Sequence, residues 1–186
     1  MKHTMRYAAA AGLAGLVLAL PAAAHPGHGE SGLAAGLLHP LTGLDHLLAL
    51  LAVGLWSRRQ RHGMVLPPVF LVLMALGASC AGMLAQGLLP ALETSIAATV
   101  LLLGVLAAAA LRMPPQPAVA LAGLCGFLHG LAHGHELAGI ASGAGFLASS
   151  ALLMGVGMLV RLEEGSRRMA GATIGAAGLC LLAGLF

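Results

Sequence analysis

The sequence predicts an all-α membrane protein, a polytopic bundle of six transmembrane helices that follows a cleavable signal peptide. Hydrophobic residues make up 59% of the 186 residues and charged residues 8%, with a mean hydropathy of +0.96. A soluble domain could not carry so apolar a surface. Apolar runs close to the roughly 20 residues that cross a bilayer core recur along the chain. These Leu, Ala and Gly runs lack the alternation of barrel strands, which leaves helices to satisfy the backbone in lipid.

The first 24 residues have the features of a secretory signal peptide. Lys2 and Arg6 precede an apolar run over residues 8–20, and the following "PAAA" ends at Ala24 in an A-x-A cleavage pattern. A retained first span is the alternative. We therefore expect a signal peptide over residues 1–24 and a single transmembrane domain over residues 25–186, so that the mature chain begins at His25.

Breakers and charges divide the remaining chain into six predicted spans. These are residues 32–57, 65–88, 92–111, 118–137, 140–160 and 168–186. Prolines fall at the helix entrances or between helices, where a missing N–H costs little.

The arginines beyond the signal peptide lie at one side of these spans only. They are Arg58, Arg59, Arg61, Arg112, Arg161, Arg167 and Arg168. The positive-inside rule then predicts a bacterial inner-membrane protein with these loops in the cytoplasm and both mature termini in the periplasm. Topology and the signal peptide account for the net charge of +3, so no nucleic-acid partner is expected.

Glycines spaced by four residues predict close helix packing. Such small-residue faces let helix backbones approach each other. Packing within one subunit is the main interpretation, and a homo-oligomer through the glycine-rich faces is the alternative. Three cysteines within the spans are interpreted as small buried side chains and not as a disulfide framework. The glycines are Gly126, Gly130, Gly134, Gly139, Gly143, Gly171 and Gly175, and the cysteines Cys80, Cys125 and Cys180.

Two polar motifs interrupt the apolar spans. In "FLHGLAHGHE", His129, His133 and Glu136 have the spacing i, i+4, i+7, which places them on one helix face. In "HPLTGLDH", His39 and His46 are seven residues apart and Asp45 is adjacent.

Counting from the arginine side of the membrane places the two motifs at matching depths. His46 and His129 are each about 11 residues, or ~17 Å, from that side, and His39 and Glu136 are each about 18 residues, or ~27 Å. The two polar faces would therefore meet in the outer half of the membrane if spans one and four pack together. Pro40 predicts a kink or break near His39, and broken helices at membrane depth are typical of cavities and ion sites.

The residue types in these motifs favour a divalent metal ion. No Lys or Arg lies in the interior of the spans to neutralise Asp45 and Glu136, and an unpaired carboxylate at depth costs several kcal/mol. Four imidazoles and two carboxylates suit a borderline dication. Structural hydrogen bonding between helices is the alternative, and a Cys125 thiolate is a further ligand candidate. The amine and imidazole of a mature N-terminal His25, with His28, are expected to capture metal outside.

At these two motifs the chain resembles the HupE/UreJ family of bacterial nickel permeases, which are associated with hydrogenase or urease gene clusters. The resemblance extends over "HPLTGLDH", the following "LAVGLW", "HGLAHGHE" and the six-span layout. It implies a metal site formed by His39, Asp45, His46, His129, His133 and Glu136. Where relatives commonly have Met, this chain has Leu50, so no thioether is available there.

The resulting expectation is a secondary permease, not an enzyme, that brings Ni²⁺ into the cytoplasm for the maturation of nickel enzymes. Co²⁺ and Zn²⁺ remain alternative ions, because affinity alone does not select among them. No prosthetic group is expected, and no Walker-type phosphate loop is present in the sequence. An intramembrane zinc hydrolase and a metal-binding membrane protein without transport activity are the alternative functions.

Overall fold

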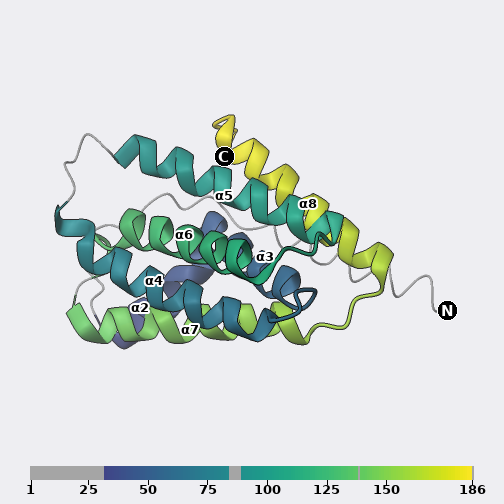
Figure 1. The fold of residues 1–186 in the computed structure, drawn as a ribbon. Helices are drawn as coiled ribbons and strands as arrows, with labels where there is room; N and C mark the ends of the chain where they lie inside the picture. Colours follow the sequence, from purple (N-terminus) through teal and green to yellow (C-terminus); the bar gives the residue numbers. More distant parts are fainter. Residues whose placement is uncertain (1–31, 84–88, 138, 186) are drawn as a thin grey trace.

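A computed structural model describes residues 32–83, 89–137 and 139–185, and every regular element in this part of the chain is a helix (Figure 1). The predicted signal peptide, His25 and His28 lie outside the described residues. The α-helices are α2 (Leu33–Thr42), α3 (Leu44–Ser57), α4 (Leu66–Cys80), α5 (Leu89–Ala109), α6 (Pro115–His133), α7 (Gly139–Leu159) and α8 (Glu164–Leu182). Two short 3₁₀ helices, η1 (Gly63–Val65) and η2 (Ala81–Met83), flank α4.

The described helices confirm the all-α fold and include candidate membrane spans. Three helical stretches are long and apolar enough to cross a bilayer: Gly63–Met83, Ala91–Ala109 and Gly139–Leu159. Helices α2 and α3 satisfy the same condition together, as one span bent by 82°. Helices α6 and α8 have 19 residues each but are not in this set, so six spans remain a prediction.

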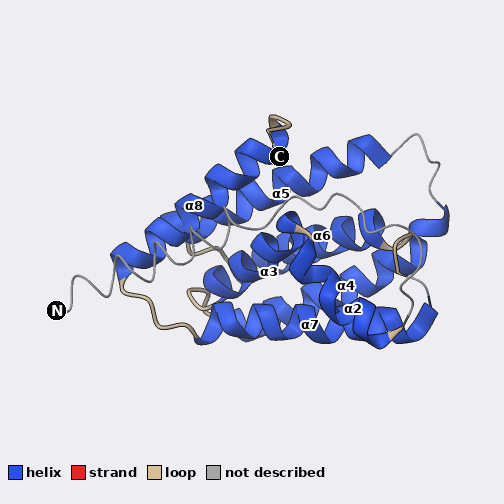
Figure 2. Ribbon diagram, turned by 180° about the vertical axis from the view of Figure 1, so that it is seen from behind, coloured by secondary structure: helices blue, strands red, loops and turns tan. Residues whose placement is uncertain are grey.

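Helix α3 is the centre of the bundle. Eleven of its 14 residues are buried, and it packs against α7 on one side and α5 on the other. Around it the remaining helices form close pairs, α4 with α6 and α5 with α8, while α2 lies along α7 (Figures 1 and 2). The hydrophobic core therefore surrounds α3, and His46 lies near the start of this helix.

Glycines make the α4 and α6 pair close, as their spacing predicts. A Cβ atom at Gly126, Gly130 or Gly134 would collide with the backbone of α4 or with Ala81 just after it. Gly139 and Gly143 differ, because a Cβ at either would meet open space. The first three glycines thus pack within the chain, and a homo-oligomer stays a prediction. Cys80, Cys125 and Cys180 are free thiols, as expected, but of the three only Cys125 is buried, and Cys80 and Cys180 are partly exposed.

The break in the first span lies four residues beyond His39, the position where it is predicted. Pro40 was expected to interrupt the helix at His39, but α2 continues through both residues to Thr42. The extended residue is Gly43, with φ −86° and ψ 113°. The carbonyl of His39 accepts hydrogen bonds from the Gly43 N–H at 3.2 Å and the Thr42 hydroxyl at 2.9 Å. These bonds close the last turn of α2, which moves the bend to the glycine.

At the opposite end of α3, hydrogen bonds join the loops that carry the arginines. The Trp56 indole N–H donates to the carbonyl of Leu111 at 3.2 Å, and the Gln60 amide donates to the same carbonyl at 2.8 Å. The Gln60 side-chain oxygen accepts from the Met113 N–H at 2.9 Å, and Arg58 donates to the Met158 carbonyl at 2.8 Å. We call this region, Trp56–Arg61 with Leu111, Met113, Met158 and Glu164–Arg168, the arginine end.

Glu164 is the acidic centre of the arginine end. It pairs with Arg168 at 3.0 Å and also with Arg59 and Arg167, so one carboxylate joins the end of α3 to the start of α8. The hydrogen bond from Arg168, followed by the bond and charge of Arg167 and the charge of Arg59, lowers the pKa of Glu164 below its ordinary value.

Candidate metal centre

The bend between α2 and α3 brings its polar residues together. Asp45 lies in the first turn of α3, and its Oδ1 accepts a hydrogen bond from the His46 backbone N–H at 2.7 Å. A carboxylate in this position also complements the partial positive charge of a helix N-terminus. Because the chain turns by 82° at Gly43, His39 and His46 face the same space from two different helices. Their ring centroids are 6.0 Å apart.

The end of α6 supplies the second half of the cluster, by a different route from the one the spacing predicts. His129 and His133 are one turn apart on α6, but the helix ends at His133. Glu136 lies in the following turn, where its N–H donates to the His133 carbonyl at 3.0 Å. The prediction that Glu136 lies on the same continuous helix as His129, at i+7, is therefore wrong. The turn folds the Glu136 carboxylate back toward His133, with Oε2 at 3.1 Å from Nδ1.

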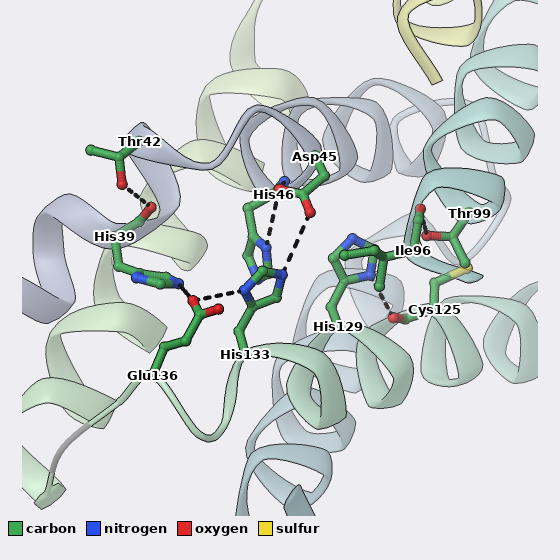
Figure 3. Close-up of polar contacts among 10 residues, drawn as sticks. All are labelled: His39, Thr42, Asp45, His46, Ile96, Thr99, Cys125, His129, His133 and Glu136. Carbon is green, nitrogen blue, oxygen red and sulfur yellow. Dashed lines mark hydrogen bonds and ion pairs between the residues drawn. The ribbon is translucent and has the colours of Figure 1, made fainter. Parts of the chain in front are cut away.

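The two halves meet between α3 and α6, as the depth count predicts (Figure 3). The His46 and His133 ring centroids are 4.1 Å apart, and His133 Nε2 lies 3.5 Å from Asp45 Oδ2. His39 Nε2 lies 3.1 Å from Glu136 Oε2. Helix α6 packs chiefly on α4, and α3 packs on α7 and α5. The two halves of the cluster therefore meet through their side chains and not through a close approach of the α3 and α6 backbones. The six residues form what we call the histidine cluster: His39, Asp45, His46, His129, His133 and Glu136.

Several ring nitrogens of the histidine cluster are buried without a hydrogen bond. Both nitrogens of His46, Nε2 of His129 and Nε2 of His133 have no such partner. His129 uses Nδ1 instead, 2.8 Å from the backbone carbonyl of Cys125. An unsatisfied buried polar atom normally costs about 1–3 kcal/mol. Neutral imidazole nitrogens are also preferred ligands for borderline transition metals, so this donor set fits a dication.

Phenylalanines that the motif analysis missed border the cluster. The Phe146 ring on α7 lies 5.5 Å from the His39 ring and 5.1 Å from the His46 ring, and Phe70 on α4 lies 5.8 Å from His129. Both are fully buried. The available signal was their rarity, since the chain has only four phenylalanines.

Other candidate residues lie apart from the histidine cluster or outside the described residues. The side chain of His135 is exposed, although it is adjacent to Glu136 in the sequence. Cys125 contacts His129 through its carbonyl oxygen, not through its thiol. Leu50 is buried one turn beyond His46 on α3. His25 and His28 cannot be placed, because both lie in the part of the chain that is not described.

Comparisons with known proteins agree with the motifs. Residues 13–181 match the family described as HupE / UreJ protein. Protein HupE of Rhizobium leguminosarum bv. viciae is 38% identical over 185 residues, which cover 92% of this chain and 95% of that protein. No solved structure matches the chain. The family match and the relative each extend over nearly the whole chain, and the protein therefore belongs to the HupE/UreJ family.

Proposed function

We propose that this protein is a permease that moves Ni²⁺ across the bacterial inner membrane into the cytoplasm, where nickel supplies hydrogenase or urease. The observation that supports it most is the histidine cluster, because four buried ring nitrogens without hydrogen bonds lie beside two carboxylates at a helix break. Membership of the HupE/UreJ family agrees with this function. Co²⁺ is a second cargo for the same donor set.

The proposed topology has six spans, with α6 and α8 as the two that complete the set. The arginine end then faces the cytoplasm by the positive-inside rule, and the mature N-terminus faces the periplasm. His25 and His28 capture the ion there and deliver it to the histidine cluster, whose six residues replace part of its water shell. A membrane potential of about 100 mV favours inward movement of a dication by about 4.6 kcal/mol.

Uptake of radioactive nickel into proteoliposomes tests this proposal. Wild-type protein with an inside-negative potential is expected to accumulate nickel, whereas His133→Ala and Asp45→Asn reduce accumulation to the level of empty liposomes. His135→Ala is the matched control, because this neighbouring histidine is exposed and outside the cluster. Equal uptake by His133→Ala and His135→Ala would contradict the proposal.

The same preparation separates the other two functions. Tight nickel binding without accumulation by wild-type protein would indicate a metal-binding protein that does not transport. Zinc-dependent hydrolysis of a lipid or amide, lost in Asp45→Asn, would indicate an intramembrane hydrolase. Either result would replace the permease proposal.

A further inference from the structure

Five of the six residues of the histidine cluster, all but His129, fall into two groups of three that share His133. His39, His133 and Glu136 form the first group, and Asp45, His46 and His133 form the second. Within each group, one potential ligand atom from every residue lies within 4.8 Å of the others. Each group therefore offers the same donor set, two imidazoles and one carboxylate.

His133 faces the two groups with opposite edges of its ring. Its Nδ1 lies 3.1 Å from Oε2 of Glu136, and its Nε2 lies 3.5 Å from Oδ2 of Asp45. Figure 3 shows His133 between the two, with His39 and Glu136 on one side and Asp45 and His46 on the other. A metal ion in the first group would bind one nitrogen of this ring, and an ion in the second group would bind the other.

Exposure differs between the two groups at two residues. The Glu136 side chain is 43% exposed and the His46 side chain 1%, whereas His39 and Asp45 are alike at 18% and 19%. The fully buried His129 lies beyond it, with its ring centroid 5.0 Å from that of His46. The first group is thus the more exposed of the two, through Glu136, and the second contains the buried His46.

We propose that the histidine cluster holds its cargo in two successive stations, an outer station (His39, His133, Glu136) and an inner station (Asp45, His46, His133). The ion enters at Glu136 and passes from Nδ1 to Nε2 of His133, exchanging His39 and Glu136 for His46 and Asp45. The imidazole changes tautomer in this step: Nε2 gives up its proton before it binds the ion, and Nδ1 takes up a proton after the ion has left, so the ring stays neutral. This inference deepens the proposed function and rests on it for the direction of movement.

Only one station is occupied at a time. Two dications separated by a single imidazole would place four positive charges beside two carboxylates, and such repulsion is strong away from bulk water. Because the donor sets match, the two stations are expected to bind the ion with similar affinity. Several sites of similar affinity let an ion enter and also leave, which conduction requires.

Double variants test the two stations through nickel binding to the purified full-length protein in lipid nanodiscs. His39→Ala with Glu136→Gln removes donors from the outer station only, and His46→Ala with Asp45→Asn from the inner station only. His39→Ala with Asp45→Asn damages both. If two stations contribute similarly to binding, a double variant whose two substitutions fall in one station leaves the other station intact. It therefore lowers the apparent affinity only about twofold, which is also the loss expected for each of its two single variants. The cross-station double loses about 100-fold, because neither station stays complete.

The contrary result is also well defined. If all six residues formed one site, the within-station doubles would lose as much affinity as the cross-station double, and the proposal would be overturned. His135→Ala is the control for nonspecific effects, and circular dichroism with size-exclusion chromatography confirms that each variant is folded. Failure of the permease proposal is separate, because it would appear as an absence of wild-type uptake whatever the binding pattern.

Discussion

The histidine cluster and the arginine end use polar groups in opposite ways, although α3 joins them. In the histidine cluster, imidazole nitrogens are buried without hydrogen bonds. At the arginine end, Trp56 and Gln60 donate to a backbone carbonyl and three arginines surround one glutamate, although Ser57 Oγ and Arg167 Nη1 are buried there without a hydrogen bond. Buried polar groups that lack partners destabilise a fold, whereas paired groups hold its elements together.

This difference separates residues that bind from residues that stabilise. Substitutions in the histidine cluster are expected to change metal affinity while leaving the free energy of unfolding unchanged or higher. Substitutions at the arginine end are expected to lower the free energy of unfolding without changing affinity. A variant that lowers both quantities together would remove the distinction.

The largest expected effect is that of His133→Ala on nickel affinity. Because His133 belongs to both groups of donors, its loss leaves neither complete, and affinity falls by about 100-fold or more. Equilibrium dialysis with nickel measures the affinity, and thermal unfolding in nanodiscs measures the stability. A large fall in melting temperature without nickel would show that His133 also supports the fold.

Gln60→Ala is expected to have the converse effect. Its side chain makes hydrogen bonds to Leu111 and Met113 that join the end of α3 to the loop between α5 and α6. Their loss also leaves the Met113 N–H without this partner, so we expect the free energy of unfolding to fall by about 1–3 kcal/mol. Denaturant unfolding measures this change, with the exposed His62→Ala as control. Nickel affinity should stay at the wild-type value.

The sequence predicts which residues of the two motifs meet better than it predicts their local geometry. Counting residues along two apolar spans placed His46 with His129 and His39 with Glu136, because helical rise is constant. It misplaced the bend, since the hydrogen bonds that keep His39 in α2 come from residues after Pro40. It also continued α6 through Glu136, although the helix ends at His133.

The residues around the cluster were beyond prediction from the motifs. Phe146 reaches His39 and His46 only because α7 packs along α2 and α3. Hydrophobic periodicity shows that a helix has neighbours but does not identify them, and nearly uniform apolar helices carry little directional pattern. The hydrogen bonds of Gln60 depend on two distant loops in the same way.

His46→Leu is expected to stabilise the protein without metal. Both ring nitrogens of His46 are buried without a hydrogen bond, which destabilises the metal-free fold. The apolar Leu side chain removes this cost, so the free energy of unfolding should rise by about 1 kcal/mol. The melting temperature in a chelator should therefore rise, while nickel affinity falls only about twofold because the outer station stays intact. A lower melting temperature would show that His46 stabilises the metal-free fold through Asp45.

The smallest expected effect concerns acid and Glu164. Its pKa is lowered chiefly by Arg168, and further by Arg167 and Arg59, so the ionised carboxylate stabilises the folded state. A lowered pKa contributes stability above the ordinary value of 4.5, and that contribution is lost as pH falls toward the folded-state value. Between about pH 5 and pH 3, wild-type protein should therefore lose more stability than Glu164→Gln, which has no charge to lose.

Because Glu164 is at the surface, salt should reduce this difference. Thermal unfolding of both proteins at low and high salt measures it, and identical pH profiles would show that the ion pairs of Glu164 contribute nothing to the stability of the arginine end.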